Sequence, residues 1–240
     1  MDAFHYYNIF DTKGLEYIAV ILFFLILIPF WFILNRPLKL MTQVKKSLGI
    51  ISASEINIPQ GLFYSKNHTW AHLESSGTAK VGLDDLLLHI TGAVKFSQLK
   101  KSGDKINKGD LIAEIDHNNK SLKVFSPISG EILATNSVLT KNPELVNNDP
   151  YQNGWMYRIK PSGWLSETNT YYLAEEATNW MFKELVRFKD FLAASMGKYS
   201  QNTANVILQD GGEILKHPLS ELPDEVWQDF QRNFLNTTMS

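Results

Sequence analysis

The longest feature in the hydrophobic pattern is an unbroken apolar run near the start of the chain. From Tyr17 to Leu34 the sequence YIAVILFFLILIPFWFIL carries no charged side chain. At about 1.5 Å rise per residue, a helix of this length just crosses a hydrocarbon layer of about 30 Å. Membrane helices tolerate a proline such as Pro29. The pattern predicts a transmembrane helix over residues 15–35, preceded by a short extracytoplasmic N-terminus, residues 1–14.

The charges on either side of this run predict its orientation. Lys13 alone precedes it, whereas the cations that follow it are Arg36, Lys39, Lys45 and Lys46. Because positively charged flanks stay on the cytoplasmic side, we expect a single-pass protein of a bacterial-type cytoplasmic membrane with its soluble part in the cytoplasm. The first residues lack the positive region of a cleaved signal peptide, and the run lacks small residues after it. The lipid bilayer is therefore the first predicted partner.

Short apolar runs separated by turn signals follow in the middle of the chain. Residues 36–58 are polar and weakly patterned, which predicts a juxtamembrane linker. Over residues 59–172, apolar runs alternate with Ser-Gly, Lys-Gly-Asp and His-Asn-Asn segments. This spacing predicts a mainly β barrel or sandwich, with short helices over residues 84–90 and 137–146.

After Tyr172 the hydrophobic period becomes that of a helix. Apolar residues from Trp180 to Leu192 share one stripe, which predicts an amphipathic helix of about twenty residues. Beyond it, residues 206–215 predict a hairpin around an Asp-Gly-Gly turn, and Pro223 opens a final short helix. Residues 173–240 are thus predicted to form a small α+β C-terminal extension.

The aromatic residues of this extension have two interpretations. Either they pack on the β domain or on one another, or they form a surface for a protein partner. Aromatic anchors dominate many interfaces, and the candidates of that kind are Trp180, Trp227 and Phe230.

Composition narrows the chemistry that the chain can perform. It has no cysteine, which excludes disulfides, thiolate zinc sites, protein-ligated iron–sulfur clusters and a cysteine nucleophile. The net charge is -2 and the Lys and Arg residues are scattered, which argues against nucleic acid as a partner. Histidines that could bind a metal, His68, His72 and His117, are not gathered by any predicted element, so no metal site is expected. No phosphate loop or nucleophile elbow is present, and we predict no enzymatic activity.

A series of short motifs runs in order through the β region. They are YSKNHTW at 64–70, VGLD at 81–84, GD at 103–104, KG at 108–109, SPISG at 126–130, PELVN at 143–147, DPY at 149–151, GW at 154–155 and IKP at 159–161. Together they resemble the H protein of the glycine cleavage system, a relative of the lipoyl and biotinyl attachment domains. The resemblance implies a barrel-sandwich hybrid of two small sheets, in which a hairpin presents one lysine that carries lipoate.

The resemblance fails at that lysine. Counted without a gap from either side, the position of the lysine falls on Asn119, and Lys120 follows it. In one interpretation Asn118 and Asn119 form the turn, since asparagine tolerates positive φ, and Lys120 is simply the solvated start of the returning strand. In the other, the tip is reorganised and Lys120 carries lipoate.

These observations lead to two functional hypotheses. The first is a non-catalytic, membrane-tethered scaffold or accessory subunit of a membrane protein complex, plausibly an electron-transfer complex, with no cofactor of its own and other membrane-complex subunits as partners. The alternative is a tethered carrier with lipoate on Lys120, which passes acyl or aminomethyl groups or electrons between enzymes.

Overall fold

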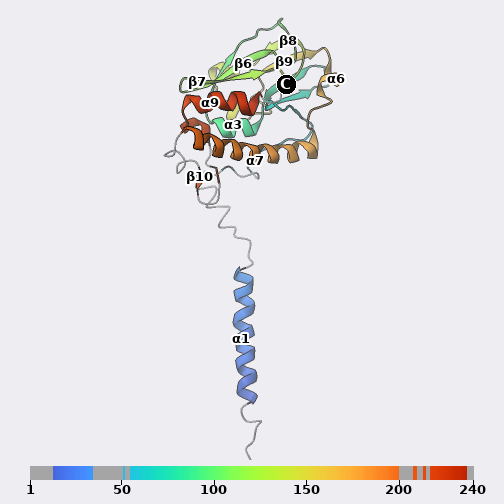
Figure 1. The fold of residues 1–240 in the computed structure, drawn as a ribbon. Helices are drawn as coiled ribbons and strands as arrows, with labels where there is room; N and C mark the ends of the chain where they lie inside the picture. Colours follow the sequence, from blue (N-terminus) through green and yellow to red (C-terminus); the bar gives the residue numbers. More distant parts are fainter. Residues whose placement is uncertain are drawn as a thin grey trace, which may run out of the picture. The chain divides into compact units, whose positions relative to one another are not determined.

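The first unit of the chain contains a single described helix. The computed structural model describes residues 13–34, 51, 55–199, 208–209, 213–214 and 217–236, and divides into two units, residues 1–47 and 48–240. The helix of the first unit is α1 (Lys13–Leu34), drawn in Figure 1. Pro29 lies in its interior. Within the described residues, no helix meets both the length and the apolarity needed to cross a membrane. The span over residues 15–35 therefore stays a prediction.

Two antiparallel sheets form the centre of the second unit. The six-stranded sheet has the order β1 (Phe63–Tyr64), β2 (Thr69–Leu73), β3 (Ala79–Leu83), β9 (Tyr157–Pro161), β8 (Gly130–Thr135), β5 (Lys105–Ile106). The three-stranded sheet has the order β4 (Lys95–Gln98), β6 (Leu111–His117), β7 (Lys120–Phe125). The mainly β prediction is confirmed.

Short helices connect strands of the two sheets. They are α3 (Asp85–Thr91), α4 (Val138–Lys141) and α5 (Leu145–Asn148). The helices described after β9 are α6 (Trp164–Thr168), the long α7 (Ala174–Tyr199), the 3-10 helix η1 (Pro218–Glu221), α9 (Asp224–Asp229) and η2 (Phe230–Leu235), a turn of wider π geometry. Strands β10 (Leu208–Gln209) and β11 (Glu213–Ile214) pair as the predicted hairpin requires. Its Asp-Gly-Gly turn, and the linker apart from residues 51 and 55–58, lie outside the described residues.

The motifs near the start of the β region shape its core. Trp70 is fully buried, and its ring packs against Gly82 on the neighbouring strand. A Cβ at Gly82 would lie 2.6 Å from the indole, so only glycine fits this close approach. Asp84 caps α3 by accepting a hydrogen bond from the Leu87 amide at 2.9 Å.

The turn between β6 and β7 consists of two asparagines. His117 pairs with Lys120, which leaves Asn118 and Asn119 as a two-residue loop with φ of 46° and 66°. Positive φ at both central residues is the geometry of a type I′ turn, which matches the twist of a hairpin. The turn of the first interpretation is confirmed. Its solvated Lys120 is wrong, because that side chain is half-buried and its Nζ donates to the backbone oxygens of Ser220 and Leu222.

This geometry predicts how the tip responds to substitution. Asn119→Val is expected to lower the free energy of unfolding by about 1–2 kcal/mol, because a β-branched residue is strained at positive φ. Asn119→Gly should leave it nearly unchanged. Urea unfolding of both variants measures the difference. Equal stability of the valine and glycine variants would contradict the turn assignment.

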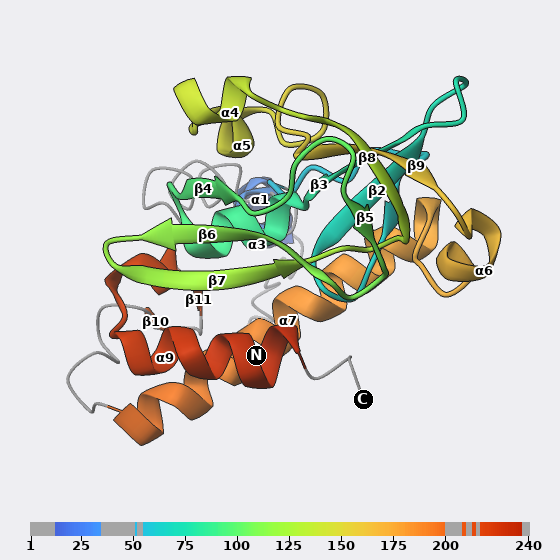
Figure 2. The ribbon, with the colours of Figure 1, turned by 90° about the horizontal axis from the view of Figure 1, so that it is seen from above.

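The C-terminal extension covers one side of this hairpin. Helix α9 contacts β7, η1 contacts α3, and α7 contacts both α9 and η2. Figure 2 shows α9 running along β7, with α7 nearby. The extension therefore packs on the barrel in the same unit.

Candidate functional site

The position where the resemblance places the lipoyl lysine is the exposed tip of the β6–β7 hairpin. Asn119 occupies it, and both Asn118 and Asn119 are exposed. An amide side chain has no amine that could form the amide bond to lipoate. The structure therefore presents an asparagine to solvent at this position.

Lys120, the adjacent candidate, is held by the extension instead. Its Nζ donates hydrogen bonds to the backbone oxygens of Ser220 at 3.1 Å and Leu222 at 2.5 Å. These carbonyls lie at the end of η1, where a cation is favoured. The same ammonium lies 5.9 Å from the centre of the Trp227 ring. The amine is thus engaged by protein atoms and half-buried.

Trp227 packs between the 3-10 helix η1 and the β6–β7 hairpin. Its side chain is fully buried, and its Nε1 donates to the Leu219 oxygen at 2.6 Å. Its ring stacks on His117 at a centroid distance of 6.1 Å. His117 Nδ1 donates to the Ala93 oxygen at 2.7 Å, which leaves Nε2 to accept from the Asn118 amide at 3.1 Å. The extension therefore covers the hairpin just behind its tip.

A second contact between barrel and extension centres on His68, in the turn before β2. The imidazole is fully buried and lies between the rings of Trp180 and Phe234, at centroid distances of 5.3 and 5.6 Å. Its Nδ1 lies 2.8 Å from Oδ2 of Asp84. Its Nε2 lies 3.4 Å from Oε2 of Glu184, within ion-pair distance but without hydrogen-bond geometry.

The two carboxylates determine the charge of this histidine. Burial lowers the pKa of His68, but Asp84 and Glu184 outweigh burial and raise the pKa from 6.5 to about 9. Burial acts in the opposite direction on Glu184 and raises the pKa of its carboxyl, but His68 and Arg187 outweigh burial and hold that pKa below its usual range. Arg187 also donates to the backbone oxygen of Phe234 at 3.1 Å. A row of alternating charges thus ties α7 and η2 to the barrel.

The candidate partner anchors lie inside the chain's own core. Trp180 is 6% exposed, and Trp227 and Phe230 are fully buried. Phe230 stacks on Phe234 and contacts the Phe188 ring edge-on. This is the packing that the sequence analysis gave as the alternative to a partner surface. A partner would have to displace it to reach these rings.

The other histidine candidates do not form a metal centre. His72 Nδ1 lies 3.3 Å from the Gly61 oxygen, and His117 makes the contacts described above. In the part of the chain that the structure describes, no group of three histidine or acidic side chains is arranged to hold a metal ion. The structure therefore leaves the three histidines in separate environments.

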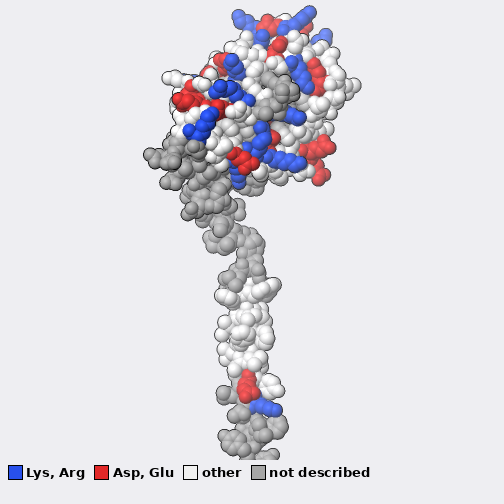
Figure 3. Space-filling model, viewed as in Figure 1, with Lys and Arg blue, Asp and Glu red and all other residues white. Residues whose placement is uncertain are grey.

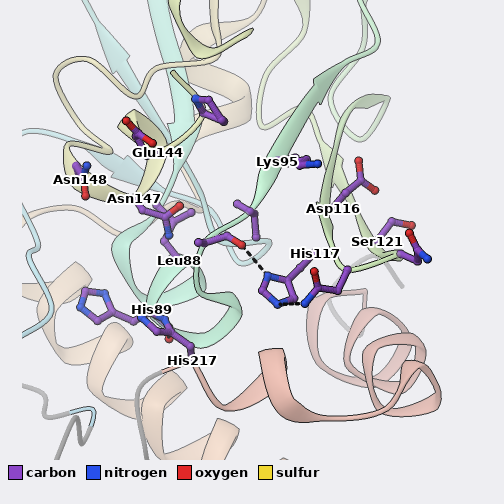
Figure 4. Close-up of a pocket in the computed structure, with 15 residues that line it drawn as sticks. Leu88, His89, Lys95, Asp116, His117, Ser121, Glu144, Asn147, Asn148 and His217 are labelled. Atoms are coloured by element: carbon purple, nitrogen blue, oxygen red, sulfur yellow. Dashed lines mark hydrogen bonds between the residues drawn. The ribbon is translucent and has the colours of Figure 1, made fainter. Parts of the chain in front are cut away.

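The other side of the hairpin is open. A cleft of about 890 Å³ lies between the hairpin tip, the end of α3 and the start of α5. Figure 4 shows Asp116 and His117 on one wall and Glu144, Asn147 and Asn148 on the other. Sequence reasoning missed this cleft, because its walls come together from segments far apart in the chain.

Comparison with known proteins identifies the family of the β region. The glycine cleavage H-protein family matches residues 62–184, half of the chain, so the chain belongs to this family. A "Probable glycine cleavage system H protein" of Thermococcus gammatolerans is 37% identical over 113 residues, 47% of this chain and 84% of the relative.

Two further comparisons cover a similar share of the chain. The glycine cleavage system H protein of Psychrobacter cryohalolentis is 37% identical over 123 residues, 51% of this chain and 97% of the relative. The crystal structure of the H protein from Mycobacterium marinum has 23% identity and a TM-score of 0.46, covering 51% of this chain and 98% of that chain. The resemblance inferred from the motifs is confirmed at the level of the family.

Proposed function

We propose that this chain is a membrane-tethered, non-catalytic H-protein-like scaffold without lipoate. As such it would be an accessory subunit of a membrane protein complex, and an electron-transfer complex is the first kind to test. The observation that carries this proposal is the hairpin tip. Asn119 stands at the exposed position where the resemblance places the lipoyl lysine, and the Lys120 amine is bound to two backbone oxygens. In this proposal the chain retains the hairpin of the family but has Asn119 in place of the lysine that would carry lipoate.

The tether is supported by the sequence of the first unit. Tyr17 to Leu34 carries no charged residue, and α1 covers these positions with its large apolar side chains from Tyr17 to Trp31 exposed. In Figure 3 this helix is without charged atoms except near its first turn. A tether would confine the domain to a thin layer at the membrane surface, which raises its effective concentration for any partner there.

The partner surface is expected outside the three aromatic candidates, because these are buried. The face of the second unit in Figure 3 mixes acidic and basic side chains without a region of one sign. This mixture supports a protein partner better than a polyanionic one. With no cysteine in the sequence, thiolate-bound redox centres would belong to other subunits.

The alternative, a carrier lipoylated on Lys120, requires the amine to leave both carbonyls and the Trp227 ring before a ligase can reach it. The full chain, expressed in cells that lipoylate a co-expressed glycine cleavage H protein, is expected to keep its unmodified mass. Asn119→Lys should gain the mass of a lipoyl group, because it restores an amine at an exposed tip. Intact-mass measurement distinguishes the two proteins. A lipoyl increment on the native chain that disappears in Lys120→Ala would establish the carrier instead.

The subunit proposal has its own test. A C-terminally tagged full chain, purified in mild detergent and examined by native mass measurement, is expected to bring other membrane subunits in a fixed ratio. Reporter fusions at the C-terminus should be active only in cytoplasmic formats. Repeated recovery of a lone chain, under conditions that keep known membrane complexes intact, would reject the proposal.

A further inference from the structure

The end of the linker is bound to the start of helix α3. The Asn57 amide donates to Oδ2 of Asp85 at 2.7 Å, and the Asn57 oxygen accepts from the Tyr151 hydroxyl at 2.8 Å. The same hydroxyl accepts from the Asp85 amide at 3.0 Å. Asp85 is 5% exposed, and the preceding linker residue Ile56 is 7% exposed. Both backbone groups of Asn57 are therefore bonded, and residues 55–58 pack on the barrel.

The other end of α3 binds the start of the extension. The backbone oxygen of His89 accepts a hydrogen bond from the His217 amide at 2.9 Å. Figure 4 shows the two histidines beside each other. Gly92, which follows α3, packs closely on the His217 side chain, because a Cβ at Gly92 would lie 2.9 Å from the His217 Cβ. Helix α3 therefore contacts the linker in its first turn and the extension in its last.

One carboxylate connects these two contacts. Oδ2 of Asp85 binds the linker, and Oδ1 lies 3.2 Å from Nδ1 of His89, one turn along the helix. The same nitrogen lies 2.8 Å from the backbone oxygen of Asp85. The residues between these two are buried, and they are Leu86, Leu87 and Leu88. Because a close-packed interior transmits strain, a shift at the start of this short helix reaches its end.

The first residue of the extension's ordered end has a strained backbone. His217 has φ of 59° and ψ of 45°, the left-handed region that is unfavourable for residues other than glycine. Such a conformation persists only where the surrounding structure enforces it, and here the end of α3 does so. Helix η1 follows at once, and the carbonyls at its end bind the Lys120 amine. The cover on Lys120 therefore depends on the position of α3.

We propose that docking of the linker on Asp85 and closure of the extension over Lys120 are coupled through α3. While residues 55–58 are bonded, α3 supports His217 and the Lys120 amine stays covered. When residues 55–58 leave the barrel, that support weakens and the carbonyls of η1 release the amine more often. The end of the linker is thus a regulatory contact for the hairpin. This coupling belongs to the second unit and does not require the subunit role.

The first measurement is the rate at which acetic anhydride acylates Lys120 in the full chain in mild detergent. Tyr151→Phe removes the hydroxyl that joins the linker to α3. It should raise this rate about fivefold, the effect of weakening the docked state by about one hydrogen bond. Tyr171→Phe is the matched control, since its hydroxyl donates to the Pro127 oxygen and not to the linker or α3. An unchanged rate in Tyr151→Phe, or an equal rise in Tyr171→Phe, would overturn the proposal.

A coupling between two contacts is reciprocal, so the second measurement runs in the opposite direction. Lys120→Gln removes the ammonium that η1 binds, and it should speed hydrogen–deuterium exchange of the Asn57 amide by a similar factor. Lys123→Gln, an exposed position on the same strand, is the control. The buried strand β3 reports global unfolding in each sample. Exchange that does not rise at Asn57, or that rises equally in β3 or in Lys123→Gln, would show that the two contacts are independent.

Discussion

Replacing His68 by leucine is expected to lower the free energy of unfolding by about 3–5 kcal/mol, the usual effect of removing one partner of a buried ion pair. The imidazolium lies between Asp84 and Glu184, and leucine would leave both carboxylates without their shared cation. Leucine would also lose the stacking with the rings of Trp180 and Phe234. Urea unfolding followed by near-ultraviolet circular dichroism measures the loss.

The same histidine predicts how stability depends on pH. The folded-state pKa, about 9, lies above the unfolded value of 6.5. The stabilisation by His68 is therefore fully present below pH 6.5 and is lost as the pH rises through about 9. We expect the native chain to lose stability across this window, and the His68→Leu variant to lose much less.

His72→Leu is the control for both measurements. His72 is only partly buried on β2, and its nearest hydrogen-bonding atom is the Gly61 oxygen at 3.3 Å. This variant should keep nearly the native stability and the native pH profile. If His68→Leu and His72→Leu have the same stability and the same pH dependence, the row of alternating charges does not hold the extension to the barrel.

Replacing Trp227 by alanine is expected to destabilise the chain by about 3–5 kcal/mol and to uncover the Lys120 amine. The fully buried indole packs on His117 and donates a hydrogen bond to the Leu219 oxygen. Without it, the end of η1 loses the support that holds its carbonyls on Lys120. The amine should then react with acylating reagents.

Pulse acylation followed by peptide mass analysis measures this exposure. In the native chain, Lys120 should react more slowly than the exposed Lys101 and Lys160, and in Trp227→Ala it should approach their rate. Trp164→Ala is the matched control, because Trp164 packs on Phe63 at the other end of the domain. Rapid labelling of Lys120 in the native chain would show that the extension does not protect it.

Local features of the structure follow from the sequence. Short apolar runs between turn residues predicted the strands, and an aspartate ahead of an apolar segment predicted the start of α3. The asparagine pair predicted the hairpin turn, since few residues adopt positive φ at low cost. The stripe from Trp180 to Leu192 faces the core of the unit, as the helical period requires.

Contacts between distant segments were not predictable in the same way. Lys120 meets Ser220 and Leu222 about a hundred residues further along, and no local pattern records such a pairing. Glu184 is a charged residue of a type that usually lies on the exposed side of a helix, yet it is 9% exposed because it faces His68. A charged residue on a helix can be buried when a residue of opposite charge lies on the surface that the helix packs against. The sequence of the helix alone does not identify that residue.

The ribosome completes the barrel before it completes the C-terminal extension that packs on it, and this order affects the nascent chain. β9, the last strand of the barrel, ends at Pro161, whereas Phe234 in η2 comes roughly 70 residues later. At about 5–20 residues per second, translation takes about 4–14 s to cover this distance. During that interval the nascent barrel lacks Phe234 beside His68, and the Lys120 amine lacks the carbonyls of Ser220 and Leu222. Any enzyme or chaperone that acts on these groups has its best access while the ribosome is still attached.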